Sequence, residues 1–217
     1  MHAALRRVHR IKRPDGRVEA AGRTDGAIAR SILLLADVDA RHIDERMPEV
    51  RRVAGEEFAR RCPPDLRDRL SPGIAPVLER LAAVRGIRLS LVTGNLEPIA
   101  RLKLERAGIG HHFPLGQGGF GSDDDDRAAL PEIARERAGE RGRPYPRERT
   151  VVIGDTPRDI ACARADGVRV IATATGPFAA DELRDADAVI GHARELPGAL
   201  KAMFARASPA PRRHTRR

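Results

Sequence analysis

Two apolar segments that each run directly into a helix constrain the fold of this chain most strongly. Segment 89–95 reads Leu-Ser-Leu-Val-Thr-Gly-Asn, and segment 151–159 reads Val-Val-Ile-Gly-Asp-Thr-Pro-Arg-Asp. Short apolar runs bounded by turn residues are typical of strands in a parallel sheet that is covered on both faces. In such sheets, residues at the carboxyl ends of the strands form the binding site. The two segments therefore predict an α/β fold with a site at one edge of the sheet.

The chain divides into two parts by its predicted secondary structure. In residues 1–72, apolar residues recur at spacings of three and four, which predicts a small helical module without strands. In residues 73–205, short apolar strands alternate with helices, which predicts a Rossmann-like, doubly wound parallel sheet. Strands are predicted at 88–92, 113–115, 150–153, 168–172 and 187–190, and helices at 74–85, 96–107, 127–138, 157–165 and 193–204.

The formal net charge of +9 does not by itself indicate nucleic-acid binding. The basic residues are spread along the chain rather than gathered in one stripe, and aromatic residues make up only 3% of it. Segment 206–217 holds five Arg with prolines and no apolar periodicity, which predicts a disordered basic tail. The charge is better suited to attracting a small anionic substrate.

The sequence shows no sign of a membrane segment or a disulfide framework. No apolar run reaches about 18 residues, and residues 1–7 contain no apolar core of a signal peptide. Cys62 and Cys162 have no partner at the spacing of a metal or redox motif. We therefore expect a cytoplasmic protein that makes no membrane contact.

Two acids follow the second strand and are candidate magnesium ligands. Asp155 lies at the strand end and Asp159 in the first helical turn, so both carboxylates can face one hard cation. Thr156, Pro157 and Asp159 also satisfy the pattern of a capping box. Capping accounts for Asp159 without a metal, but it leaves Asp155 unexplained.

The first strand ends in a candidate anion site. Asn95 is expected to cap the helix that starts at Leu96. The main-chain N–H groups of that helix start, together with the Thr93 hydroxyl, would suit an anion. The alternative is that Thr93, Gly94 and Asn95 only form a turn.

Two cations are candidates for contacting a bound phosphate. Arg127 follows the acidic run 122–126, whose charge also complements the start of the next helix. Lys103 lies on the predicted helix 96–107, where a lysine is more commonly a solvated surface residue. The sequence leaves the choice between Arg127 and Lys103 open.

The order of these motifs resembles the haloacid dehalogenase superfamily over roughly residues 74–200. Segment 22–28, Gly-Arg-Thr-Asp-Gly-Ala-Ile, looks like the helical cap of its phosphoglycolate-phosphatase-like members. The resemblance implies a small phosphorylated substrate and Mg²⁺ as cofactor. It implies the following roles: Thr93 and Asn95 at the transferring phosphoryl group with Gly94 beside them, Arg127 or Lys103 as the neutralising cation, Arg23 as a cap contact to substrate, and Asp155 and Asp159 as metal ligands.

The motif that carries the covalent step in this superfamily is absent from the sequence. Members begin with an apolar strand ending in Asp-x-Asp-Gly-Thr, whose first Asp forms an aspartyl-phosphate. We expect a missing first core strand, caused by a mis-set start codon or a truncated gene. Its neighbours in the sheet would then lose main-chain partners. Segment 32–39 imitates the motif with Asp37 and Asp39, but its upstream spacing is helical and no Gly-Thr follows.

The predicted function is a Mg²⁺-dependent phosphatase-type hydrolase of a small, phosphoglycolate-like phosphomonoester. The full enzyme would act through an aspartyl-phosphate, and the chain as written would be inactive or impaired. One alternative is a non-catalytic module that binds phosphate or metal. Another is a haloacid dehalogenase, which needs no Mg²⁺ and therefore fits Asp155 and Asp159 less well. The sequence specifies neither the substrate nor the oligomeric state.

Overall fold

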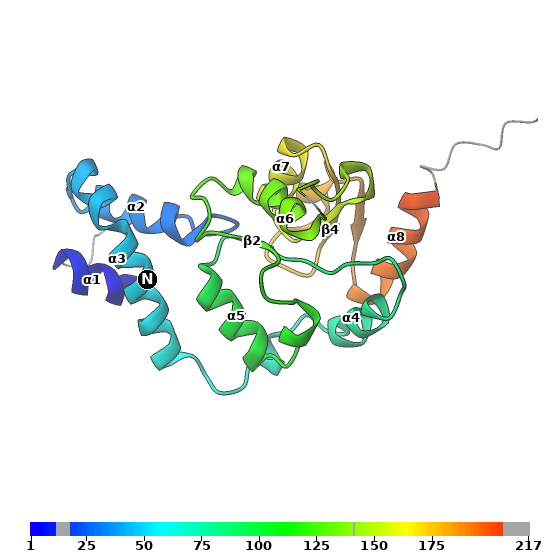
Figure 1. Cartoon of the computed structure of the whole chain (residues 1–217), viewed down its shortest axis with the longest axis horizontal. Helices are drawn as coiled ribbons and strands as arrows, with labels where there is room; N and C mark the ends of the chain where they lie inside the picture. Colours follow the sequence, from blue (N-terminus) through cyan, green and yellow to red (C-terminus); the bar gives the residue numbers. More distant parts are fainter. Residues whose placement is uncertain (12–17, 141, 206–217) are drawn as a thin grey trace, which may run out of the picture.

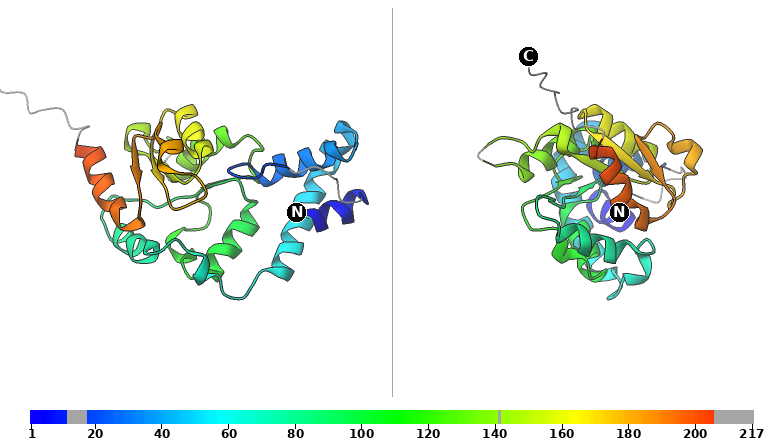
Figure 2. Two further views of the ribbon diagram at one scale, coloured as in Figure 1. Left: turned by 180° about the vertical axis from the view of Figure 1, so that it is seen from behind. Right: turned by 90° about the vertical axis from the view of Figure 1, so that its right-hand side faces the viewer.

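The computed structural model describes residues 1–11, 18–140 and 142–205 of the chain. Three helices lie together at one end of the molecule, and helix α8 (Leu196–Ala205) lies at the other (Figures 1 and 2). These three are α1 (His2–His9), α2 (Asp25–Leu35) and α3 (Ala40–Arg61). The predicted tail, 206–217, lies outside the described residues.

The described residues before Pro72 form helices and no strand, as the apolar spacing predicts. Helix α2 begins at a side-chain cap, where the Thr24 hydroxyl accepts a hydrogen bond from the Ala27 amide at 3.2 Å. Helix α3 begins in the same way, with the Asp39 carboxylate accepting from the His42 amide at 3.1 Å. A predicted module boundary at residue 72 stays a prediction.

The imitation motif around Asp37 and Asp39 does not follow a strand. Residues 32–35 lie in helix α2, Asp37 adopts a left-handed conformation with φ 55°, and Asp39 caps helix α3. The helical spacing of Ile28, Ile32 and Leu35 therefore identifies this segment correctly. The interpretation of Asp37 and Asp39 as a nucleophile motif is wrong.

The second part alternates short strands with helices. The helices are α4 (Ile74–Ala82), α5 (Glu97–Arg106), α6 (Leu130–Ala138), α7 (Pro157–Ala165) and α8. The strands are β1 (Val92–Thr93), β2 (Gly119–Phe120), β3 (Val151–Gly154), β4 (Arg169–Thr173) and β5 (Ala188–Ile190). Single 3-10 turns are η1 (Arg67–Arg69), η2 (Gly110–His112), η3 (Arg127–Ala129), η4 (Arg147–Arg149), η5 (Ala180–Leu183) and η6 (Ala193–Glu195). Within the described ranges, no helix is long and apolar enough to cross a bilayer.

The strands pair only in parallel, which confirms the predicted α/β class. Strand β1 pairs with β2, and β4 lies between β3 and β5 in a separate sheet. The strand predicted at 113–115 is wrong, because the strand lies instead at Gly119–Phe120 in the glycine-rich segment. A Cβ atom on Gly119 would lie 2.1 Å from the Leu130 carbonyl oxygen. The glycines there allow strand β2 to pack tightly against helix α6.

The two sheets are not joined by hydrogen bonds in the described part of the chain. Strand β1 has only β2 as a partner, and β3 has only β4, so each leaves one edge open. In strand β3, Val152 is 6% exposed whereas Ile153 is 44% exposed, although both are apolar. Each of these two strands therefore has one side without a strand partner among the described residues.

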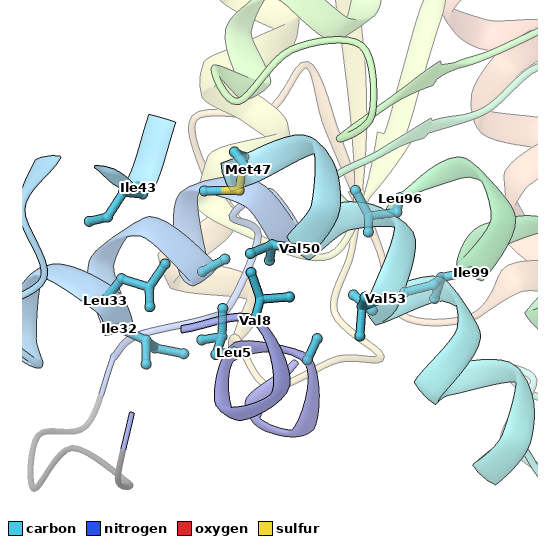
Figure 3. Close-up of a cluster of buried hydrophobic side chains, with 13 residues drawn as sticks. Leu5, Val8, Ile32, Leu33, Ile43, Met47, Val50, Val53, Leu96 and Ile99 are labelled. Atoms are coloured by element: carbon cyan, nitrogen blue, oxygen red, sulfur yellow. The ribbon is translucent and has the colours of Figure 1, made fainter. Parts of the chain in front are cut away.

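One hydrophobic cluster contains side chains of both the helical module and the α/β part. It contains side chains from α1, α2 and α3 and also takes in Leu96 and Ile99, which lie at the start of α5 (Figure 3). Leu5, Leu33 and Val50 at its centre are fully buried. The helical module therefore shares its core with helix α5.

The central position of Leu33 predicts a large loss of stability on truncation. We expect Leu33→Ala to lower the free energy of unfolding by about 2–5 kcal/mol, because the cavity remains inside a closed cluster. Leu35, two residues later on the same helix, is 55% exposed and provides the matched control. Leu35→Ala should change stability by less than about 0.5 kcal/mol in urea unfolding. Equal losses in the two variants would contradict this description of the core.

Candidate functional site

The junction after strand β1 is held by contacts to the glycine-rich segment and to the helical module. The Gly121 amide donates to the Thr93 carbonyl at 3.0 Å, and the Thr93 hydroxyl accepts from the Asn95 amide at 3.2 Å. A Cβ atom on Gly94 would lie 2.2 Å from the Arg23 carbonyl oxygen. Gly94 therefore allows the main chain of the helical module to pass directly against the end of β1.

Asn95 does not cap helix α5, contrary to the prediction. The helix begins at Glu97 after Leu96. The Asn95 side chain instead accepts from Lys103 Nζ at 2.7 Å and donates to the Asp25 carboxylate at 3.4 Å. It links the start of α5 both to a cation and to the helical module.

The N–H groups at the start of α5 already hold a side-chain anion. The Leu96 amide donates to Asp25 Oδ2 at 2.8 Å, and the Glu97 amide donates to the Ser122 hydroxyl at 2.8 Å. A carboxylate is favourable there because the positive end of the helix dipole lies at the helix start. Asp25 and Ser122 therefore occupy the N–H groups at which the sequence predicts an anion site, and the binding of an external anion there stays a prediction.

The junction after strand β3 contains the predicted capping box. Asp159 Oδ2 accepts hydrogen bonds from the amides of Asp155 and Thr156 at 3.1 and 3.0 Å, and from the Thr156 hydroxyl at 2.8 Å. Its other oxygen pairs with Arg127, which approaches from η3. Asp159 is therefore already used for capping and ion pairing.

Asp155 lies in a different electrostatic environment. Burial raises the pKa of the Asp155 carboxyl, and the neighbouring Asp159 carboxylate raises it further. A Cβ atom on Gly176 would lie 2.2 Å from Asp155 Oδ2, so the chain after β4 packs against this carboxylate. Among the described residues, Asp155 forms no ion pair with an arginine or lysine. The Arg127 charge lowers this pKa only in part. An acid that is partly buried, has no direct ion pair and lies beside a second acid could serve as a Mg²⁺ ligand.

The candidate cations are divided between the two junctions. Lys103 lies at the first one, where it contacts Asn95 and packs over the Phe58 ring at 5.4 Å. Arg127 lies at the second one, on Asp159. The Arg23 guanidinium lies at neither, because it donates to Ser31 Oγ at 2.8 Å in helix α2.

Segment 22–25 of the helical module connects the two junctions. A Cβ atom on Gly22 would lie 2.7 Å from Thr156 Oγ1 at the second junction, and the Asp25 amide donates to the Gly94 carbonyl at 2.7 Å at the first. Between them, the Thr24 hydroxyl donates to the Asp125 carbonyl at 2.7 Å. Segment 22–25 of the helical module therefore contacts the chain at the carboxyl ends of both β1 and β3.

Three residues of this site were not predicted from the sequence as site residues: Asp25, Ser122 and Gly176. Asp25 and Ser122 look like ordinary helix-start residues, and Gly176 lies in a connection with no motif. Their roles depend on contacts between distant parts of the chain, for which a single sequence carries no local signal.

Comparison with known proteins shows the family and the fold of the chain. A family model described as haloacid dehalogenase-like hydrolase matches residues 1–164. The fold is similar to that of a putative beta-phosphoglucomutase from Bacteroides vulgatus, with a TM-score of 0.57 and 19% identity over 85% of this chain and 72% of that one.

Two kinds of curated relative are each 32% identical to this chain over the matched region. A protein named tyrosine-protein kinase PtkA from Mycobacterium tuberculosis matches 58% of this chain and 42% of its own length. A protein named phosphoserine phosphatase from Thermus thermophilus matches 52% of this chain and 44% of its own length. The chain thus spans less than half the length of these relatives.

The raised pKa of Asp155 predicts a dependence of stability on pH. Because the folded chain binds this proton more tightly than the unfolded chain, the contribution of Asp155 is full below the unfolded pKa of about 3.8 and is lost as the pH rises through the folded pKa. In EDTA, Asp155→Asn should therefore melt at a higher temperature than the wild type at neutral pH. The difference should disappear in acid.

Thermal melting across the pH range tests this prediction, with Asp181→Asn as the control because Asp181 is an exposed acid on η5. An Asp155→Asn variant that is less stable than the wild type at neutral pH would contradict it.

Proposed function

Because the chain belongs to the haloacid dehalogenase-like hydrolases, we propose that it forms the phosphate- and metal-binding part of a Mg²⁺-dependent phosphatase-type hydrolase. The observation that supports this most directly is the pair of junctions at the ends of parallel strands β1 and β3. One offers a hydroxyl, an amide side chain and helix N–H groups, and the other offers two carboxylates. This combination suits a phosphomonoester together with a divalent cation.

The first junction would bind the phosphoryl oxygens. Thr93 and Asn95 would donate from their side chains. Gly94 would admit a phosphate to the main chain only if the Arg23 carbonyl, which lies against it, moved away. For the amide of Leu96 to take part, the Asp25 carboxylate must release it. Arg23 would reach a substrate only by leaving Ser31.

The second junction would hold the cation. Asp155 would be the principal ligand, and Asp159 would contribute if Arg127 moved away from it. Bound Mg²⁺ would neutralise charge on the phosphoryl oxygens. Arg127 and Lys103 remain the two candidates for the side chain that neutralises the rest of this charge, and each lies at one junction.

We place the nucleophile on a strand that pairs between β1 and β3. The open edges of these strands offer main-chain groups to such a strand. Its carboxyl end would then emerge between Thr93 and Asp155. A carboxylate there would attack phosphorus and release the alcohol, and water would then hydrolyse the aspartyl-phosphate to inorganic phosphate.

The strand proposal predicts that activity depends on an added segment. We expect the 217-residue chain to hydrolyse p-nitrophenyl phosphate very slowly with Mg²⁺. Adding an amino-terminal strand that ends in Asp-x-Asp-Gly-Thr should restore turnover by at least about a hundredfold. The control carries the same strand with its first Asp changed to Asn, which should restore nothing. Robust turnover by the 217-residue chain, abolished by Asp37→Asn, would contradict the proposal.

Substitution of the two cations in the strand-extended protein separates their roles. Substitution by Met of the cation that contacts the phosphoryl group should lower kcat by a factor of about 10²–10³. We expect this loss for Lys103→Met or for Arg127→Met, but not for the exposed control Lys201→Met. Melting temperatures must be compared as well, because Arg127→Met also removes the counter-ion of Asp159. An unchanged kcat in both variants would exclude both cations from catalysis.

The rival functions differ in what is bound and where the phosphoryl group goes. Mg²⁺ and phosphate binding without turnover in the strand-extended protein would favour a non-catalytic module. Release of halide from a 2-haloacid without Mg²⁺ would favour a dehalogenase. Transfer of the phosphoryl group from ATP to a tyrosine peptide would favour the activity for which the mycobacterial relative is named.

A further inference from the structure

Two histidines and a glutamate form a cluster away from the strand junctions. Glu79 lies on helix α4, and His111 and His112 lie on the 3-10 turn η2. Glu79 Oε1 is 3.4 Å from His111 Nε2 and 3.6 Å from His112 Nε2. In the described part of the chain, this is the one group of three or more such side chains whose ligand atoms all lie within 4.8 Å of one another.

Hydrophobic packing holds the two elements of this cluster in place. Leu78, next to Glu79, is buried in a cluster with Ile109 and Phe113, which flank η2 on either side. The turn is closed by a hydrogen bond from the Phe113 amide to the Gly110 carbonyl at 3.1 Å. Because the main chain is fixed on both sides, ligand binding would need only small side-chain rotations.

The two imidazole rings differ in exposure but face the same carboxylate oxygen. The His112 side chain is 4% exposed, whereas those of His111 and Glu79 are 62% and 65% exposed. The ring centroids are 4.0 Å apart at an interplanar angle of 43°. One buried ring thus provides a fixed donor, and two exposed side chains can close around a cation from the solvent.

The donor set selects the kind of cation. Two imidazole nitrogens and one carboxylate oxygen suit Zn²⁺ and similar transition metals, whereas Mg²⁺ prefers oxygen ligands. With metal–ligand distances of about 2.0–2.2 Å, tetrahedral ligands lie about 3.4 Å from one another. The glutamate–histidine distances are close to this value.

We propose that Glu79, His111 and His112 bind a Zn²⁺-type divalent cation and thereby clamp helix α4 to η2. His111 also lines an open cavity of about 510 Å³, so the cation would lie beside solvent. Three protein ligands leave the fourth tetrahedral position for water or an exchangeable ligand. The site is separate from Asp155 and Asp159 and differs from them in metal preference.

Calorimetric titration of the tag-free, EDTA-treated 217-residue protein with ZnCl₂ tests the proposal. We expect one site in the wild type, with affinity lowered about tenfold or more in Glu79→Gln and in His111→Ala. Both substituted side chains are exposed, so the variants should fold. His192→Ala replaces an exposed histidine elsewhere and should bind Zn²⁺ like the wild type. Zn²⁺ should also raise the melting temperature of the wild type but not of Glu79→Gln.

Two results would overturn the proposal. One is the absence of Zn²⁺ binding to the wild type, or equal affinity in the wild type, Glu79→Gln and His111→Ala. The other is binding that disappears in Asp155→Asn but persists in Glu79→Gln, which would assign the metal to the junction after β3. Binding that is kept in Asp155→Asn and lost in Glu79→Gln supports the proposal.

Discussion

Asp25 attaches the helical module to the α/β part through its main chain and its carboxylate together. Its amide bonds to the Gly94 carbonyl, and its carboxylate accepts from the Leu96 amide at the start of helix α5. Leu96 and Ile99 of the same region complete the hydrophobic cluster of the module. The hydrogen bonds of Asp25 and the apolar packing of Leu96 and Ile99 therefore lie together at the start of helix α5. The position of the helical module relative to the α/β part depends on both kinds of contact.

The two acids of the second junction show how the surroundings of a side chain determine its role. Asp159 is the more deeply buried, at 5% exposure, but three hydrogen bonds and Arg127 balance its charge. Asp155 has no direct ion pair among the described residues, and burial together with the Asp159 charge raises its pKa despite the nearby Arg127. A buried charge is costly unless it is paired, so Asp155 is the acid with most to gain from a bound cation.

The sequence predicts well those features that depend on local pattern. The apolar run Val151–Ile153 forms strand β3 as expected, and the capping box of Thr156 and Asp159 is present. Strand β2 was missed because its two residues, Gly119 and Phe120, carry no strand pattern. The strand forms only because it pairs with β1 and packs on α6.

The same distinction explains the errors in the site. Asn95 has the right residue type for a helix cap. Its side chain is used elsewhere, because its amide nitrogen donates to the Asp25 carboxylate and its oxygen accepts from Lys103 Nζ. The prediction that Arg23 contacts a substrate stays a prediction, and in this structure its guanidinium donates to Ser31 on helix α2. These outcomes depend on which distant groups come together, so spacing along the chain could not reveal them.

The carboxylate of Asp25 acts as an internal ligand of the helix start to which a substrate phosphate would bind. A phosphate that accepted the Leu96 N–H group would have to displace the Asp25 carboxylate from it, so under the proposed function these two contacts would exclude each other. The apparent affinity for phosphate would then be the intrinsic affinity multiplied by the fraction of molecules in which Asp25 has withdrawn. By the same linkage, phosphate would shift the module away from its present position.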